Sequence, residues 1–79
     1  MTELEKLRVM LPHWIEHNRS HVKEFKKWAE IIGNEGEAEI AAFIEKAISG
    51  LTEADQVLTQ ALEKAGGPSG DADADHHLH

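Results

Sequence analysis

Apolar residues recur at alternating intervals of three and four through the first part of the chain, which is the spacing of one face of an α-helix. The series consists of Leu4, Leu7, Leu11, Trp14 or Ile15, Val22, Phe25, Ala29 and Ile32, with Asn18 as its one polar member. Thr2 and Glu5 form a capping-box pattern at its start. The pattern therefore predicts a helix that reaches residue 32.

Pro12 lies inside this series. Proline removes a backbone donor and clashes with the carbonyl four residues earlier, so it kinks or breaks a helix. Two interpretations remain open at this point. One is a single bent helix, and the other is a short helix over residues 3–11 followed by a second over residues 12–32, with Pro12 in its first turn.

A short polar segment, Gly33-Asn34-Glu35-Gly36, follows the first series. Gly33 is a suitable left-handed C-cap, and Asn34 with Glu37 three residues later can cap the next helix. Because the connection is short, the helices on either side of it are expected to run antiparallel.

A second apolar series predicts a helix over about residues 35–65. Its members are Ile40, Ile44, Ala47, Leu51, Ala54, Leu58, Ala61 and Ala65, and Phe43, Ile48, Val57 and Leu62 widen the stripe. A break at Ser49-Gly50 is the alternative, since Thr52 and Asp55 form another capping pattern. The register survives across Gly50, which favours one continuous helix.

Gly66-Gly67-Pro68-Ser69-Gly70 ends this helix and begins a tail rich in glycine, aspartate and histidine. The expected organisation is a helical domain over residues 1–65 and a flexible tail over residues 66–79.

The expected fold is all-α, an antiparallel helical hairpin. Two helices cover only one side of each other, so the wide second stripe needs a further partner. Either the piece before Pro12 folds back as a short third helix, or two chains pair as a homo-oligomer into a four-helix bundle. Pairing is the preferred interpretation.

Composition narrows the classes of function. The 79 residues include 15 acidic and 8 basic side chains, for a net charge of −7, which argues against nucleic acid as a partner. There is no cysteine, so thiol chemistry and zinc–thiolate sites are excluded. No apolar run approaches membrane-spanning length and the first residues are charged, so no membrane partner is expected and the cytoplasm is the expected location.

Histidine is the one unusual component, with six residues of the 79. His13, His17 and His21 follow one another at intervals of four, and Glu24 lies three residues, or about one helical turn, after His21. On a straight helix His13 and His21 lie about 12 Å apart along the axis, so one ion cannot join both. The candidate ligand pairs are therefore His13 with His17, or His17 with His21, with Glu24 as an additional ligand.

The tail carries His76, His77 and His79 among aspartates, a composition typical of metal-gathering segments. A remnant of a purification tag is the alternative origin of these three residues. Imidazole suits nickel, cobalt, zinc or copper ions, and the absence of thiolates argues against copper(I). A different interpretation of the whole histidine series is a helix surface that only shapes a dimer or partner interface, or responds to pH.

The segment Leu11-Pro12-His13-Trp14-Ile15-Glu16-His17-Asn18, with His21, Phe25, Trp28 and Ala29, resembles a family of small helical domains that often carry a histidine-rich tract at one end. The resemblance covers roughly residues 4–65. It implies a role in nickel or cobalt handling, with His13, His17 and His21 as functional residues. The tail of this chain is short for a storage role.

No motif indicates an enzyme. The chain lacks a pair of Glu-x-x-His motifs, a glycine-rich phosphate loop and a recognised nucleophile frame. The sequence therefore predicts a metal-binding accessory protein for nickel, cobalt or zinc, with a metal transporter or a metalloenzyme-maturation protein as its partner. A helical interaction or dimerisation module without a metal role is the alternative.

Overall fold

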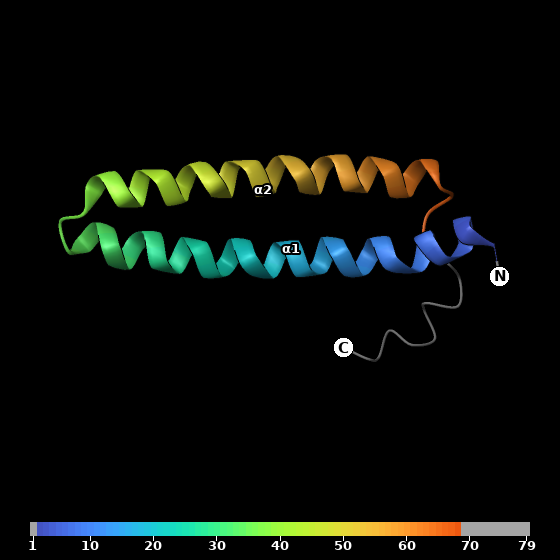
Figure 1. Cartoon of the computed structure of the whole chain (residues 1–79), viewed down its shortest axis with the longest axis horizontal. Coiled ribbons are helices and arrows are strands. Elements are labelled where there is room, and N and C mark those ends of the chain that lie inside the picture. Colours follow the sequence, from blue (N-terminus) through green and yellow to red (C-terminus); the bar gives the residue numbers. More distant parts are fainter. Residues whose placement is uncertain (1, 69–79) are drawn as a thin grey trace.

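A computed structural model describes residues 2–68, and these form two long helices joined by a tight turn. Helix α1 spans Glu3–Asn34 and helix α2 spans Ala38–Lys64. They run antiparallel over almost their whole length (Figure 1). The predicted all-α helical hairpin is thus confirmed. The predicted tail lies outside the described residues from Ser69 onward.

Helix α1 begins as the capping box predicts. The Thr2 hydroxyl accepts a hydrogen bond from the Glu5 amide at 3.1 Å, and the Glu5 carboxylate accepts one from the Thr2 amide at 3.0 Å. The helix then continues through Pro12 without a break. Burial of Leu11 and Ile15 on either side offsets the cost of the missing proline donor. The alternative of a separate helix before Pro12 is therefore wrong.

The connection between the helices lies about one helical turn later in the sequence than predicted. Gly33 is still helical, and Gly36 (φ 91°) is the residue in the left-handed region. The Gly36 amide donates to the Gly33 carbonyl at 3.0 Å and the Glu37 amide to the Ile32 carbonyl at 3.1 Å, which satisfies the end of α1. Asn34 is inside α1 and cannot cap α2, whose N-cap is Glu37 without a side-chain hydrogen bond.

Gly33 does not cap α1 and instead lies beside α2. A Cβ atom at this position would lie 3.6 Å from Cβ of Ala41. That distance is an ordinary van der Waals contact, so α1 and α2 lie side by side next to the turn.

Helix α2 is continuous across Gly50, as the preserved register predicts. Gly66 (φ 108°) and Gly67 (φ 83°) end it in the left-handed region. Arg8 of α1 reaches this end and donates to three backbone carbonyls: Gly67 at 2.8 Å, Pro68 at 3.2 Å and Gly66 at 3.3 Å. A guanidinium thus satisfies carbonyls that follow the C-terminus of α2, where a positive charge is also favourable.

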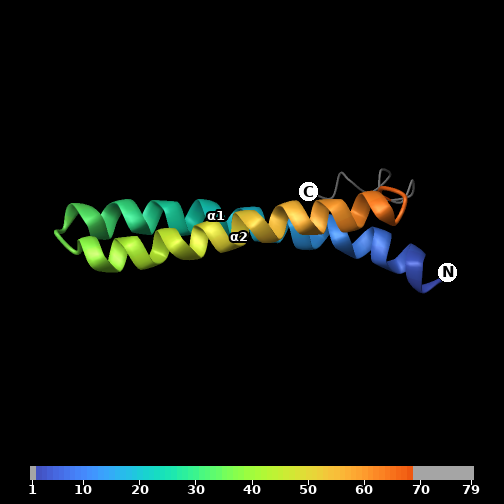
Figure 2. The ribbon, with the colours of Figure 1, turned by 90° about the horizontal axis from the view of Figure 1, so that it is seen from above.

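The core between the helices is narrow. Leu11, Ile15 and Ala29 are buried, all from α1, and no residue of α2 is buried. The helices cross at a small angle, so that α1 lies on one side of α2 near the turn and on the other side near the chain ends (Figure 2). Four members of the predicted α2 series are exposed, namely Ile40, Ala47, Ala54 and Ala61. Much of the α2 apolar stripe is therefore left uncovered by α1.

Within the described residues, neither helix has a stretch apolar and long enough to cross a membrane.

Candidate functional site

His17 and His21 form a close pair on the surface of α1. Their Nε2 atoms lie 3.0 Å apart, and the rings meet edge to face with centroids 4.5 Å apart and planes at 86°. The four-residue interval places both side chains on one side of the helix, one turn apart. The separation is short enough for a hydrogen bond, in which one Nε2 carries the hydrogen and the other accepts it.

This separation also matches the spacing of two ligands on one transition-metal ion. Imidazole nitrogen bonds such ions at about 2.0–2.1 Å, so two nitrogens at a right angle lie about 2.9 Å apart and two at the tetrahedral angle about 3.3 Å. The observed 3.0 Å is closer to the right-angle value. By distance alone the pair is therefore compatible with two right-angle positions of an octahedral or square-planar ion, whereas a tetrahedral ion needs the two nitrogens about 0.3 Å further apart.

Two neighbours lie beside the ring of His21. The Glu24 Oε1 atom lies 3.8 Å from Nδ1, the nitrogen that does not face His17. The Phe25 ring lies on the other side, with centroids 6.0 Å apart and a tilt of 36°. When Nε2 binds an ion, Nδ1 carries the ring hydrogen, and a carboxylate that accepts this hydrogen orients the ring. At 3.8 Å the Glu24 carboxylate lies near Nδ1 without a hydrogen bond to it, so a small shift of its side chain would give that supporting contact. Direct ligation by Glu24 stays a prediction.

An open, mainly apolar groove of about 460 Å³ begins at His21 and runs between the two helices. Its lining comprises His21, Glu24, Phe25 and Trp28 of α1 and Ile44, Ala47 and Leu51 of α2. The histidine pair thus lies at the edge of an apolar depression on the surface.

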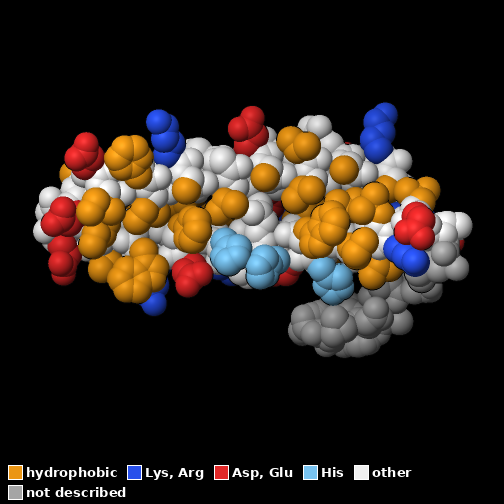
Figure 3. All heavy atoms as spheres, in the orientation of Figure 1, with side chains coloured by type: hydrophobic (Ala, Val, Ile, Leu, Met, Phe, Trp, Pro, Cys, Tyr) orange, Lys and Arg blue, Asp and Glu red, His pale blue; other side chains and the backbone are white. Residues whose placement is uncertain are grey.

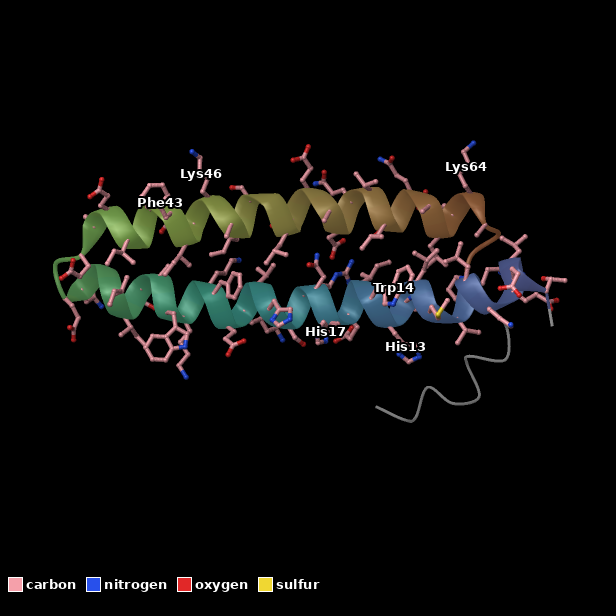
Figure 4. The ribbon with its side chains drawn as sticks, viewed as in Figure 1. His13, Trp14, His17, Phe43, Lys46 and Lys64 are labelled. Atoms are coloured by element: carbon pink, nitrogen blue, oxygen red, sulfur yellow. The ribbon has the colours of Figure 1, made fainter. Side chains whose placement is uncertain are left out.

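The remaining predicted ligands are not brought to this pair. His13 projects from the edge of α1 that lies away from α2, as does His17 (Figure 4). Among residues 2–68, no group of three or more histidine, aspartate or glutamate side chains is arranged to hold a metal ion. His76, His77 and His79 lie outside the described residues. The described hairpin therefore brings two imidazoles together, and ligation by His13 or Glu24 stays a prediction.

The face of the hairpin that carries the groove is rich in exposed apolar side chains. Figure 3 shows hydrophobic groups over both helices, with histidines near the middle of α1. Among residues 2–68, the large exposed apolar side chains are Leu4, Met10, Trp14, Trp28, Ile31, Ile40, Phe43 and Val57. Trp28 is 50% exposed and Phe43 is 65% exposed. Patches of this kind mark interaction surfaces in soluble proteins.

Sequence patterns did not reveal the polar contacts between the helices. The Arg19 guanidinium donates two hydrogen bonds to the Asp55 carboxylate, at 2.6 and 3.2 Å, and the Thr59 hydroxyl donates to the same carboxylate at 3.4 Å. These hydrogen bonds, the Arg19 one above all, lower the pKa of Asp55, against the opposing effect of burial, and the hydrogen bond to Asp55 raises the pKa of Arg19. Arg19 and Asp55 meet only when the two helices align in this register, and no local motif in the sequence encodes that alignment.

Asn18, the polar member of the α1 series, also contacts α2. Its Nδ2 atom donates to the Leu51 carbonyl at 2.8 Å. A polar side chain in a helix seam fixes the register of the partner helix. Its position in the apolar series was the available signal, although its acceptor could not be identified from the sequence.

A family model described as a domain of unknown function, DUF8180, matches residues 7–65. No curated protein and no solved structure matches the chain. The matched residues extend from the second turn of α1 past the end of α2, so they cover nearly the whole hairpin. The chain therefore belongs to the DUF8180 domain family.

Proposed function

We propose that this protein is a transition-metal-binding accessory protein, with nickel or cobalt favoured over zinc. The observation that carries the proposal is the 3.0 Å separation of Nε2 of His17 and Nε2 of His21 on an exposed helix surface. Two imidazoles so placed bind one ion as a chelate, because the helix already holds them at the ligand spacing. The resemblance to domains of nickel and cobalt handling agrees with this choice.

The ion is cargo in this proposal, which involves no enzymatic reaction. The pair is on the surface, so an ion bound there is open to exchange with a partner. His13 one turn earlier and the tail residues His76, His77 and His79 would capture the ion and pass it to the pair. The partner that receives it is a metal transporter or a metalloenzyme-maturation protein, and the proposed location is the cytoplasm.

Calorimetric titration with nickel, cobalt and zinc tests the proposal. The protein is the full-length chain with His76, His77 and His79 replaced by Ala, so that only helix histidines remain. We expect one class of site, which the pair His17→Ala and His21→Ala removes without loss of helicity. Because metal affinity depends directly on the ligand set, the loss should be at least about tenfold.

The single variant His13→Ala is the matched control, since it removes an imidazole from the same helix and leaves the pair intact. We expect its nickel affinity to stay within about threefold of the parent chain. Equal affinity in the parent and the His17/His21 double variant would refute the proposal.

The exposed apolar face supports a second candidate, a helical interaction module without a metal role. Trp14, Trp28, Phe43 and Val57 are all large and exposed on a hairpin with only three buried residues. The titration separates the two candidates, because a pure interaction module would show no nickel binding that depends on His17 and His21.

A further inference from the structure

The exposed stripe of α1 is arranged symmetrically about Arg19. At about 100° per residue, Met10, Trp14, His17, His21, Glu24 and Trp28 fall within about 80° of arc. Positions at equal distances before and after residue 19 in the sequence form three pairs: His17 with His21, Trp14 with Glu24, and Met10 with Trp28. A two-fold symmetric interface requires such self-complementarity, because each residue then meets its symmetric position on the other copy.

The exposed stripe of α2 has the same kind of symmetry, about Thr52. Phe43, Ala47, Gly50, Ala54, Val57 and Ala61 also fall within about 80° of arc. Each large residue lies as far from residue 52 as a small one: Phe43 with Ala61, and Val57 with Ala47. Gly50 pairs with Ala54 in the same way, and a Cβ atom at Gly50 would have no neighbour within 4 Å.

The two centres of symmetry lie at the same level of the hairpin. Asn18 donates to the carbonyl of Leu51, and Arg19 pairs with Asp55, so residue 19 of α1 lies beside residues 51–55 of α2. The groove between His21 and Ala47 shows that both stripes are on one face. One two-fold axis perpendicular to the helices therefore satisfies both stripes together.

We infer that a second copy of this chain covers this face, with α1 antiparallel to α1 of the partner subunit and α2 antiparallel to α2 of the partner subunit. The result is a four-helix bundle with large residues packed over small ones. The metal site of this dimer rests on the proposed function, because the axis brings the two His17/His21 pairs together. A two-imidazole half-site on each copy then becomes one four-imidazole site at the centre.

The size of the face agrees with a stable dimer. Helices of this length are about 40 Å long, and two of them side by side are about 20 Å wide, which offers about 800 Å² per copy. A standard stable interface buries about 800 Å² per partner. The apolar character of the face and the narrow core of the single hairpin favour burial of most of that area.

Sedimentation velocity and native mass spectrometry test the inference on the full-length chain with His76, His77 and His79 replaced by Ala. With nickel present, we expect a dimer at about 100 µM chain, and one nickel ion for every two chains. The variant Ala54→Glu places two like charges near the axis and should be monomeric. Ala54 is exposed in the single hairpin, so its helicity should not change.

Gln56→Glu is the matched control, because it adds the same charge to an exposed position two residues away on the outer side of α2. It should remain dimeric. Met10→Glu provides a second disruptive variant on α1, and it should weaken nickel binding at least about tenfold through loss of the partner's ligands.

A chain that stays monomeric with nickel at this concentration would overturn the inference, and if it bound one ion per chain through His17 and His21 the proposed function would stand. A dimer that Ala54→Glu disrupts, but that binds no nickel, would support the interface and refute the metal role. The inferred interface would also be overturned if the variants Ala54→Glu and Met10→Glu both formed dimers as readily as the parent chain.

Discussion

Leu11 is the most buried side chain of the hairpin, with 2% of its surface exposed, and its replacement by alanine should destabilise the fold strongly. Leucine-to-alanine changes at buried positions cost about 2–5 kcal/mol. The core here has only two layers of side chains and can relax around a cavity, so a cost of about 2–3 kcal/mol is expected. Domains of this size have about 3–5 kcal/mol of core stability in total. Most of the stability would therefore be lost.

Leu4→Ala is the matched control, because it makes the same substitution in the same helix at a side chain that is 53% exposed. Its expected cost is about 0.5 kcal/mol. Urea unfolding, followed by tryptophan fluorescence and far-ultraviolet circular dichroism at one fixed chain concentration, measures both values. The slope with urea should be unchanged. Equal costs for the two variants would refute the placement of the core between α1 and α2.

Three further predictions concern polar contacts. Asp55 has a lowered pKa in the fold, so its pairing with Arg19 stabilises the protein above the ordinary aspartate pKa, and this stabilisation is lost as the pH falls through the lowered value. In thermal unfolding from pH 6 to pH 2, Asp55→Asn should therefore reduce the fall in melting temperature at acid pH. An unchanged fall would contradict this. In the variant Arg8→Lys, the single ammonium group cannot donate to the carbonyls of Gly66, Gly67 and Pro68 together. Amide hydrogen exchange over residues 64–67 should therefore accelerate, while the centre of α2 keeps its protection. Equal acceleration across all of α2 would show that Arg8 does not stabilise this end of the helix locally. Glu24→Gln removes the carboxylate beside Nδ1 of His21 and should weaken nickel binding about tenfold in calorimetry, whereas no change would remove Glu24 from the site.

The sequence predicted the elements of the fold because their signals are local. Apolar spacing indicated both helices, and the hydroxyl of Thr2 and the carboxylate of Glu5 identified the first residue of α1. The turn was placed at Gly33, where either Gly33 or Gly36 satisfies the local rule. The structure uses Gly36, which has the positive φ, whereas Gly33 lies beside Ala41 of the other helix.

The candidate site was predictable for a similar reason. The interval between His17 and His21 is a property of one helix, so their proximity follows from α-helical geometry. The side of the His21 ring that Glu24 approaches depends on side-chain rotamers, which spacing does not specify. The contacts of Arg19 with Asp55 and of Arg8 with the end of α2 depend on the register between the helices. Asn18 helps to set that register through the carbonyl of Leu51.

Nitrogen NMR of the histidine side chains, with zinc as a diamagnetic probe, tests the central claim most directly in the native full-length chain. Zinc binding at the pair should shift Nε2 of His17 and Nε2 of His21 together. If two copies share one ion, the shifts should be complete at about half an equivalent of zinc. Unchanged Nε2 signals of both residues, with shifts confined to His76, His77 and His79, would contradict a metal site on the helix.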